Sequence, residues 1–449
     1  MSQQLELTIE QPAYGGAGLA RHEGRIVFVE GGLPGSRVLA RVLKEEKSCL
    51  RAVAEKVLDP SPQAAEPFCA HFGTCGGCTW QDAAYPAQLT WKRDIVSEQL
   101  KRLGGIETQV DETMASPLER LYRNKMEFAF GPGQGHGLRL GLRERLNPGR
   151  VLEVETCHLM PPLAMDILRT VRRLTLATQL PPYFSRTGTG AWRHLVLRHS
   201  EKSDSWLAQI IVGPKTPFKR LSSLVETLMD EYEQLSGVVV GIRRDRADFA
   251  IAETRGKLVG EDFLEEDLDG LTLRVSADAF FQTNTRAATL LYAKAVEAAN
   301  LTGEETVWDL YCGAGGLTAY MARAAKKVIG FEISEPAVED ARTNAAQNDL
   351  YNCAFVAGDL KDAVARQKSK PDVVIIDPPR AGLHPDTIEI LHKIAAPRLV
   401  YVSCNPSTLA RDLGRLSDQY SVSRVTPVDL FPHTSHIECV ATLERRASL

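Results

Sequence analysis

The first sixty residues alternate short apolar runs with glycine-rich turns. The runs LELTIE, RIVFVE and RVLARVL are separated by segments such as YGGAGLARHEG and GGLPGS. Apolar and β-branched runs between glycine and proline turns indicate strands. Several short strands with few helix signals suit a small closed barrel of the OB type. We therefore expect an OB-like β-barrel over residues 1–60, followed by a Pro-Ser-Pro linker at 60–62.

The next two hundred residues mix helical and strand-like patterns. The stretch AAYPAQLTWKRDIVSEQLKRLGG predicts a helix that stops at a double glycine. Strand-like runs follow it, namely KMEFAFG, LRLGLRE, HLVLRHS, WLAQIIVG and GVVVGIRRD. This pattern predicts a central α+β domain over residues 61–270. We expect its helical part, residues 83–115, to pack on the C-terminal domain.

From residue 271 the pattern becomes a regular alternation of short apolar strands and amphipathic helices. The expected strands are TVWDLY, KKVIGFE, CAFVAGD, DVVIIDPP and RLVYVSC. Such alternation is typical of βαβ units and predicts a doubly wound parallel sheet. The fold class is therefore α/β, with a Rossmann-like C-terminal domain over residues 271–449.

Composition narrows the class of protein. The chain has 449 residues, 44% of them hydrophobic and 24% charged, and no apolar run approaches the length that spans a bilayer. The N-terminal MSQQLELTIEQ lacks the features of a signal peptide. We therefore expect a cytoplasmic protein with no membrane partner, and we expect it to be a monomer. Nine cysteines in a reducing compartment are metal ligands, catalytic thiols or core residues rather than disulfides.

The net charge of -4 hides an asymmetry along the chain. Residues 120–220 carry 17 Lys and Arg against 7 Asp and Glu, whereas residues 221–276 carry 6 against 13. A basic stretch of this kind is either a solvated face or a surface for a polyanion. It makes RNA a candidate partner.

A glycine turn at the start of the C-terminal sheet is the candidate cofactor site. Residues 309–316 read DLYCGAGG and follow an apolar strand. Glu332 and Asp359 end the next two strands, where an acid can bind ribose hydroxyls. The sixth position of a dinucleotide fingerprint is Thr318 here instead of glycine, which disfavours a nicotinamide cofactor. The phosphate-free cofactor S-adenosylmethionine fits better.

Three further motifs converge on the same edge of the sheet. Asp377 begins the motif DPPR after the fourth strand, Cys404 lies in YVSCNP after the fifth, and Glu438 ends FPHTSHIE. A thiol and a carboxylate brought together at a cofactor edge suggest covalent catalysis. The other cysteines of this domain, Cys312, Cys353 and Cys439, are expected to be core residues.

The chemistry of pyrimidine methylation needs both of these groups. C5 of a pyrimidine is too weak a nucleophile to attack a sulfonium methyl directly. A thiolate that adds at C6 creates an enolate, C5 then takes the methyl group, and a base removes the C5 proton so that the thiolate can leave. Cys404 fits the nucleophile and Glu438 fits the base.

Four cysteines in the central domain form a candidate metal site. Cys69, Cys75 and Cys78 are closely spaced around a Gly-Gly pair, and Cys157 lies far downstream. Four thiolates suit zinc or an iron–sulfur cluster, and the lack of a second C-x2-C pair favours a [4Fe–4S] cluster. We expect this cluster to be structural and to lie away from the methyl donor.

Taken together, these segments resemble the RNA uracil-5-methyltransferase family, in particular its iron–sulfur branch that methylates 23S ribosomal RNA and begins with a TRAM barrel. The resemblance covers nearly the whole chain. Besides the motifs above it includes AYGGAG at 13–18, FVEGGLPG at 28–35, CGGC at 75–78, YRNK at 122–125 and FQTN at 281–284.

The resemblance implies a set of site residues. Cys69, Cys75, Cys78 and Cys157 would bind a [4Fe–4S] cluster, and Cys404 and Glu438 would be nucleophile and base. S-adenosylmethionine would be bound by Gln282, Tyr311, Gly316, Glu332, Asp359 and Asp377. Some family members have asparagine where this chain has Gly316 and Asp359, and alanine as the third residue of DPPR.

Three other functions are weighed against this one. A cytosine-5 RNA methyltransferase would show a second cysteine near the fourth-strand motif, and Pro378, Pro379 and Arg380 offer none. A tRNA uridine-5 methyltransferase remains an alternative, because barrel and cluster suit any folded RNA. A non-catalytic iron–sulfur RNA-binding protein would explain the barrel and the cysteines, but it would not need Cys404 with Glu438.

Overall fold

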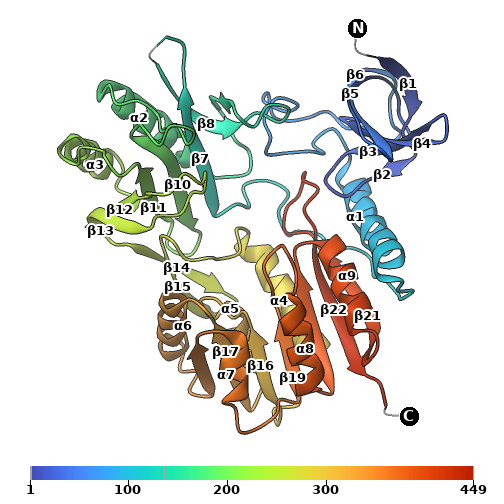
Figure 1. Ribbon diagram of the computed structural model, residues 1–449. Coiled ribbons are helices and arrows are strands. Elements are labelled where there is room, and N and C mark those ends of the chain that lie inside the picture. The colour runs from blue at the N-terminus through green and yellow to red at the C-terminus, as the bar shows by residue number, and fades with distance from the viewer. Residues whose placement is uncertain (1–2, 136, 448–449) are drawn as a thin grey trace.

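Three lobes make up the protein, each built around one large sheet (Figure 1). The structure is a computed structural model that describes residues 3–135 and 137–447. The first lobe is a sheet in the order β1-β5-β6-β4-β3-β2. Its strands are β1 (Gln4–Thr8), β2 (Gln11–Pro12), β3 (Gly18–His22), β4 (Arg25–Glu30), β5 (Arg37–Glu45) and β6 (Cys49–Asp59). Register shifts between β5 and β6 let this sheet curl around an apolar core.

The helix that follows the barrel packs against the C-terminal lobe. α1 (Tyr85–Gln99) begins with a proline at its first turn and continues into a π-helical turn, η1 (Leu100–Gly104). Its apolar face, including Trp91 and Ile95, shares one core cluster with Leu409 and Leu413 of the C-terminal lobe. Helix α1 therefore packs beside β21 and α9 although it is more than three hundred residues away in sequence (Figure 1).

The central lobe is a sheet in the order β13-β12-β11-β10-β7-β8-β9. Its elements are β7 (Lys125–Pro132), β8 (Leu138–Arg143), β9 (Val151–Leu152), α2 (Leu163–Ala177), β10 (Trp192–Ser200), β11 (Ser205–Val212), α3 (Lys219–Glu231), β12 (Leu235–Ile242) and β13 (Thr254–Gly260). Helices α2 and α3 pack on this sheet through residues such as Leu168 and Val225. The hairpin of β14 (Phe263–Leu268) and β15 (Leu271–Ser276) leads on to the third lobe.

The C-terminal lobe is a sheet in the order β18-β17-β16-β19-β20-β22-β21. Its strands are β16 (Thr306–Leu310), β17 (Lys327–Glu332), β18 (Cys353–Ala357), β19 (Val373–Ile376), β20 (Arg398–Ser403), β21 (Tyr420–Val428) and β22 (Glu438–Arg445). Its helices are α4 (Thr285–Ala299), α5 (Gly316–Ala322), α6 (Glu335–Gln347), α7 (Leu360–Ala365), α8 (Pro385–Ile394) and α9 (Pro406–Leu416).

The first five strands of this sheet are parallel, and the order reverses between β16 and β19. Ligands of such sheets bind beyond the carboxyl ends of the strands at this reversal point. The predicted Rossmann-like sheet and N-terminal barrel are both confirmed. No helix in the part of the chain that the structure describes is long and apolar enough to cross a membrane.

Candidate active site

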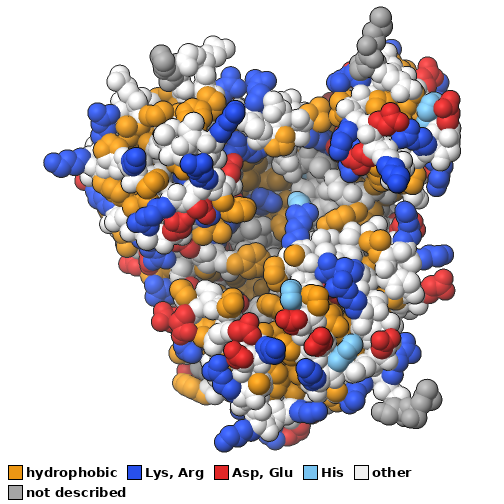
Figure 2. Space-filling view, viewed as in Figure 1, with side chains coloured by type: hydrophobic (Ala, Val, Ile, Leu, Met, Phe, Trp, Pro, Cys, Tyr) orange, Lys and Arg blue, Asp and Glu red, His pale blue; other side chains and the backbone are white. Residues whose placement is uncertain are grey.

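A cleft of about 770 Å³ opens at the carboxyl edge of the C-terminal sheet. Figure 2 shows that the molecule is hollowed between its three lobes. Seven of the eight residues predicted to bind the cofactor or to act in catalysis line this one cleft. They are Gln282, Tyr311, Gly316, Glu332, Asp377, Cys404 and Glu438.

The glycine turn after β16 forms one wall of the cleft. Tyr311, Gly313 and Gly315 all have left-handed backbone conformations, with φ of 69°, 51° and 81°. Glycine adopts this conformation without strain, which explains the two glycines. The carboxylate of Glu332 accepts hydrogen bonds from the backbone N–H of Gly313 at 3.1 Å and of Ser334 at 2.9 Å. Glu332 therefore fixes the turn from the tip of the neighbouring strand.

Asp309 lies beneath this turn and also lines the cleft. It is buried, and its Oδ2 accepts a hydrogen bond from Thr318 at 2.5 Å. Its Oδ1 has no partner among the described residues. Burial raises the pKa of Asp309 to about 7, with a hydrogen bond from Thr318 opposing the shift. A buried carboxylate with a free acceptor atom is suited to an ammonium group such as that of a methionine moiety.

Gly316 lines the cleft as expected, whereas Asp359 does not. A Cβ at Gly316 would be 3.5 Å from the ring of Tyr292, an ordinary contact, so this glycine is not required by lack of space. Asp359 lies outside the cleft, in an adjoining cavity of about 380 Å³ that Tyr311 and Glu332 also line. Its Oδ1 accepts from the N–H of Lys361 and caps α7.

Gln282 reaches the cleft from the segment before α4. It is buried, and its backbone carbonyl accepts a hydrogen bond from the Asn124 side chain at 2.8 Å. Two residues later, Asn284 caps α4 and donates to the carbonyl of Leu430 at 2.9 Å. From the residues alone, the motif FQTN at 281–284 predicts only the start of a helix. Nothing in that local pattern shows that Gln282 faces a ligand.

Cys404 and Glu438 stand opposite each other at the end of one antiparallel ladder. Ser403 of β20 pairs with Cys439 of β22, so Cys404 and Glu438 are each one residue beyond this pair, toward the cleft. Residues directly opposite each other in a ladder project from the same face. The nucleophile and base predicted from sequence are therefore neighbours in the fold.

Burial and nearby charged groups shift the pKa values of Cys404 and Glu438. Burial raises the pKa of Glu438 well above its ordinary value, and Asp377 raises it further. Burial raises the pKa of Cys404 to about 12, and the charges of Glu438 and Asp377 add to the shift. Arg380 acts in the opposite direction on both groups. Arg380 is thus the cation that favours a thiolate and a carboxylate here.

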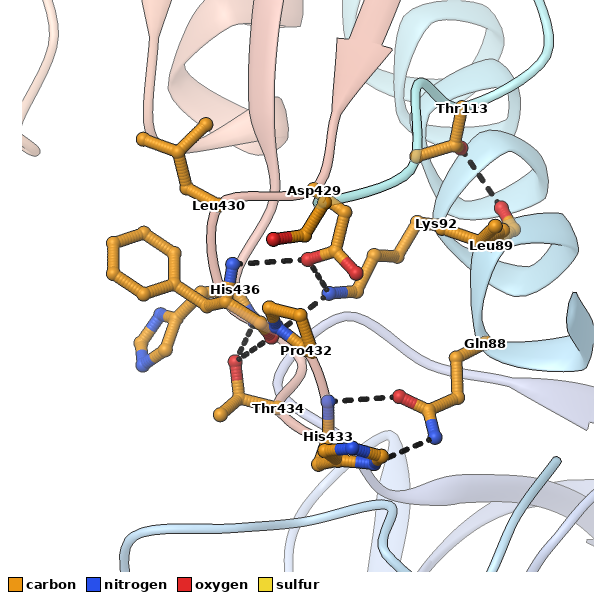
Figure 3. A network of polar contacts seen from close by, with 12 residues as sticks. Gln88, Leu89, Lys92, Thr113, Asp429, Leu430, Pro432, His433, Thr434 and His436 are labelled. Carbon is orange, nitrogen blue, oxygen red and sulfur yellow. Dashed lines mark hydrogen bonds and ion pairs between the residues drawn. The ribbon is translucent and has the colours of Figure 1, made fainter. Parts of the chain in front are cut away.

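The loop before β22, residues 429–437, is held by helix α1 (Figure 3). We call it the base loop because it leads into Glu438. Lys92 forms an ion pair with Asp429 at 2.6 Å and donates to the carbonyl of Phe431 at 3.1 Å. Both side chains of the pair are fully buried. Sequence reasoning missed Lys92, since a lysine in a helical pattern normally faces solvent.

The barrel also reaches the cleft. Its turn between β2 and β3 packs on the base loop, where a Cβ at Gly16 would lie 3.2 Å from the Ser435 hydroxyl. The hydroxyl of Tyr14, in the same turn, is buried. Burial raises the pKa of Tyr14, and nearby Arg380 lowers it. The barrel therefore contributes to the surroundings of Cys404, which the sequence pattern did not show.

The four cysteines of the predicted metal site line one cavity of about 640 Å³. Burial raises the pKa of Cys75, of Cys157 and of Cys78, the last to about 12, and neighbouring thiols add to each shift. Within residues 3–135 and 137–447 no three acidic, cysteine or histidine side chains are close enough to bind a single ion. The four thiols therefore line the same cavity, but they are farther apart than the thiolates that bind one zinc ion.

The cysteine cavity adjoins the cleft, but none of its four cysteines lines the cleft, and the separation of the cluster from the methyl donor stays a prediction. The cysteine cavity and the cleft share wall residues, among them Arg123, Phe280 and Thr283. Arg123 and Thr283 belong to the motifs YRNK and FQTN, which join the central lobe to the base of α4. The sequence could not show this, because the two cavities are brought together by the packing of separate lobes.

A doubly wound sheet with a glycine turn, strand-end acids and this cleft defines the class of S-adenosylmethionine-dependent methyltransferases. Comparisons with known proteins refine the assignment. Residues 249–446 match the tRNA (uracil-5-)-methyltransferase family, and residues 2–54 match the TRAM domain. An RNA methyltransferase of Nitratidesulfovibrio vulgaris is 40% identical over 98% of this chain and 96% of that protein. One of Chlorobaculum tepidum is 37% identical over 94% and 92%. The chain belongs to this family of RNA methyltransferases.

A solved structure supports the same conclusion. The tRNA (uracil-54, C5)-methyltransferase of Pyrococcus abyssi, in complex with S-adenosyl-L-homocysteine, matches 98% of this chain and 100% of its own. Its TM-score is 0.76 at 26% sequence identity. The agreement extends over all three lobes and not only over the common methyltransferase sheet.

Proposed function

We propose that this enzyme methylates C5 of a uridine in structured RNA, most specifically in 23S ribosomal RNA. The observation that supports the proposal is the facing pair Cys404 and Glu438 at the cofactor edge of the sheet. A methyltransferase acting on an oxygen or an exocyclic nitrogen has no need of a thiol beside a buried carboxylate. Carbon methylation at C5 needs both.

In the proposed reaction Cys404 adds to C6 of the uracil and C5 becomes nucleophilic. S-adenosylmethionine, when bound, supplies the methyl group at its sulfonium. Glu438 then removes the proton from C5, and the bond between C6 and the Cys404 sulfur breaks to release the product. A raised pKa makes Glu438 a stronger base once it is ionised, which suits the removal of a proton from carbon.

The cofactor would be held by the residues that surround the glycine turn. We propose that Glu332 binds ribose hydroxyls and that Asp309 and Asp377 face the methionine end, with Gln282, Tyr311 and Gly316 completing the wall. Asp359 would act from the adjoining cavity, which continues from Tyr311 and Glu332. Asp309 supports this arrangement, because it lines the cleft and its buried Oδ1 has no hydrogen-bond partner among the described residues.

RNA must present its uridine outside the stack, because a sulfur and a methyl donor cannot reach opposite faces of a base within a helix. The hollow between the lobes can accept a base turned outward (Figure 2). The basic stretch 120–220 supports RNA binding by the central lobe. The 23S target rests on the resemblance to the iron–sulfur branch of the family, which begins with a TRAM barrel and methylates 23S ribosomal RNA. The Pyrococcus abyssi enzyme acts on tRNA, which makes tRNA the alternative target.

We also propose that Cys69, Cys75, Cys78 and Cys157 bind a [4Fe–4S] cluster. The shared cavity of about 640 Å³ supports a group larger than one ion. Burial raises the pKa of Cys75, Cys78 and Cys157, and a bound metal would stabilise these buried groups as thiolates. Bound there, the cluster would cross-link two distant segments of the central lobe.

Two variants test the proposed chemistry. Cys404→Ala should bind S-adenosylmethionine but form neither methylated RNA nor a covalent complex, because no enolate arises. Glu438→Gln should transfer the methyl group and then stall, so that a methylated RNA adduct survives denaturation. RNA from a strain that lacks the modification is the substrate, and denaturing gels and methyl mapping are the measurements. Turnover by Cys404→Ala, or normal product release by Glu438→Gln, would refute the assigned roles.

The same assay decides between targets. Labelled S-adenosylmethionine is offered with 23S rRNA and, separately, with bulk tRNA from that strain. Methylation of the rRNA alone supports the proposal, whereas methylation of tRNA alone would replace the target by the alternative. Binding of RNA without any methyl transfer would favour the non-catalytic reading.

A further inference from the structure

His433 of the base loop is surrounded by residues next to the four cysteines. The backbone N–H groups of Thr79 and Trp80, directly after Cys78, both donate to the carbonyl of His433, at 2.9 and 3.0 Å. The ring of Phe68, directly before Cys69, packs edge-on against the imidazole with centroids 4.9 Å apart. Both ends of the segment that holds three of the cysteines therefore contact one residue.

The downstream cysteine joins the same arrangement. The imidazole of His158, directly after Cys157, also packs edge-on against Phe68, with ring centroids 5.4 Å apart. Inside the segment, the side chain of Gln81 accepts a hydrogen bond from the backbone of Cys69 at 3.2 Å. Residues next to Cys69 and Cys78 thus contact His433 directly, and the residue after Cys157 is linked to it through Phe68.

Helix α1 also contacts His433, through Gln88 (Figure 3). Gln88 accepts from the backbone N–H of His433 at 2.9 Å and donates to its Nδ1 at 3.2 Å. His433 is only 5% exposed and has a left-handed φ of 65°, a conformation that residues other than glycine rarely adopt because Cβ crowds the backbone. Strain of this kind persists only where the surroundings determine the conformation.

We propose that His433 is a positioning residue through which the four-cysteine segment sets the place of Glu438. This inference rests on the proposed function, because it concerns the base of that reaction. The chain from His433 to Glu438 is five residues long and passes Ser435, which the barrel turn at Gly16 also contacts. Loss of order around the cysteines would therefore move the carboxylate and leave the glycine turn and the cofactor wall unaffected.

The central test is His433→Gly. Glycine keeps the left-handed backbone and the three hydrogen bonds made by the backbone of residue 433. It removes the imidazole and with it the contacts to Phe68, Tyr85, Gln88 and the carboxylate of Glu119, which lies 3.9 Å from Nε2. Proton removal from C5 should slow by about 10- to 100-fold, the effect that a misplacement on the order of 1 Å produces. On RNA with deuterium at C5 of the target uridine, the variant should show a larger isotope effect than the wild type and should accumulate the methylated adduct.

Two further measurements and two further variants distinguish a positioning role of His433 from a general loss of structure. Affinity for S-adenosylmethionine and iron content should equal those of the wild type, because neither site contains His433. Phe68→Leu should raise the isotope effect in the same direction from the cysteine side. Ala395→Gly, which relaxes a left-handed residue at the end of α8, is the matched control and should change none of these quantities.

Hydrogen exchange gives a test without turnover. In Cys75→Ser protein the backbone amides of residues 429–437 should exchange faster than in the wild type, while those of residues 309–316 should not. Wild-type isotope effect and adduct level in His433→Gly, or unchanged exchange in Cys75→Ser, would overturn the inference. If the wild type itself formed no adduct and no methylated RNA, the proposed function would have failed instead.

Discussion

Lys92 of helix α1 and Asp429 of the base loop form an ion pair from which solvent is excluded, with Nζ 2.6 Å from Oδ1. The partners are 337 positions apart in the chain. Asp429 also accepts a hydrogen bond from the backbone of Phe431 at 2.9 Å. Because two buried charges lose their hydration, this pair is tolerable only while both partners are present.

Removing one partner should therefore be costly. Lys92→Met leaves an unpaired buried carboxylate and should lower the free energy of unfolding by about 3–5 kcal/mol. Adding Asp429→Asn to it should restore part of that loss, since the double variant buries no charge. Urea denaturation of the single and double variants measures the difference.

An exposed ion pair is the control. Lys326 lies 3.2 Å from Glu304, and both side chains are largely exposed. Lys326→Met should leave the unfolding midpoint unchanged. Additive effects of Lys92→Met and Asp429→Asn would show that the two residues are not coupled.

The sequence predicted those parts of the fold and of the site that depend on local patterns. Alternation of strands and helices predicted the C-terminal sheet, and the strand-end motifs predicted Cys404, Glu438 and Asp377 at one edge. These predictions succeeded because parallel strands place their carboxyl ends together whatever the rest of the fold does. The glycine turn at 313–315 was predicted for a similar local reason, since left-handed backbone favours glycine.

The sequence did not predict the contacts between lobes. Lys92, Tyr14 and His433 lie near the cleft because a helix and a barrel turn from the N-terminal half pack on the base loop. Nothing in their local patterns distinguishes a helical lysine that pairs with a buried aspartate from one on a solvated face. The position of the cysteine cavity beside the cleft was missed for the same reason, since distances between lobes leave no periodic signal.

The reactivity of Cys404 should respond to its two charged neighbours with opposite signs. The thiolate is the reactive form, and a pKa of about 12 keeps it scarce near neutrality. Glu438→Gln removes a negative charge that raises this pKa, so the pKa should fall and alkylation at a given pH should become faster. Arg380→Met removes the cation that lowers it, so alkylation should become slower.

The measurement is the rate of iodoacetamide labelling of the peptide that contains Cys404, followed by mass spectrometry from pH 7 to 10. Labelling of Cys353 in the same sample is the internal control, because neither substitution touches its surroundings. Equal pH profiles in the two variants would show that charge does not control this thiol.

Glu266 in β14 should make the stability of the protein depend on pH. Its carboxyl is buried, and burial raises its pKa to about 8. The folded state thus binds the proton more tightly than the unfolded state, so stability falls as pH rises from about 4.5 to about 8. Glu266→Gln cannot ionise, and should be more stable than the wild type at pH 9 by a few kcal/mol, since each unit of pKa difference is worth about 1.4 kcal/mol.

At pH 5 the two proteins should have similar stability, because the wild-type carboxyl is then protonated in the folded state. Thermal unfolding at both pH values gives the comparison. Since Glu266 lies outside the cleft residues, the affinity for S-adenosylmethionine should be the same in both proteins. If the wild type became more stable relative to Glu266→Gln between pH 5 and pH 9, this prediction would be wrong.

The four cysteines of the shared cavity should act as one metal site. Protein purified without oxygen should be brown and should contain iron and acid-labile sulfide, because four thiolates around a cavity of about 640 Å³ suit a [4Fe–4S] cluster. Replacing Cys69, Cys75, Cys78 or Cys157 by Ser should each remove most of the iron, since a cluster bound by three thiolates is more easily lost.

Cys353→Ser is the matched control: this half-buried cysteine of β18 lies outside the cavity and its loss should leave the iron unchanged. Iron and sulfide analysis together with the visible absorption spectrum provide the measurement. Zinc bound in place of iron, or an equal loss of iron in Cys353→Ser, would contradict the assignment of this site.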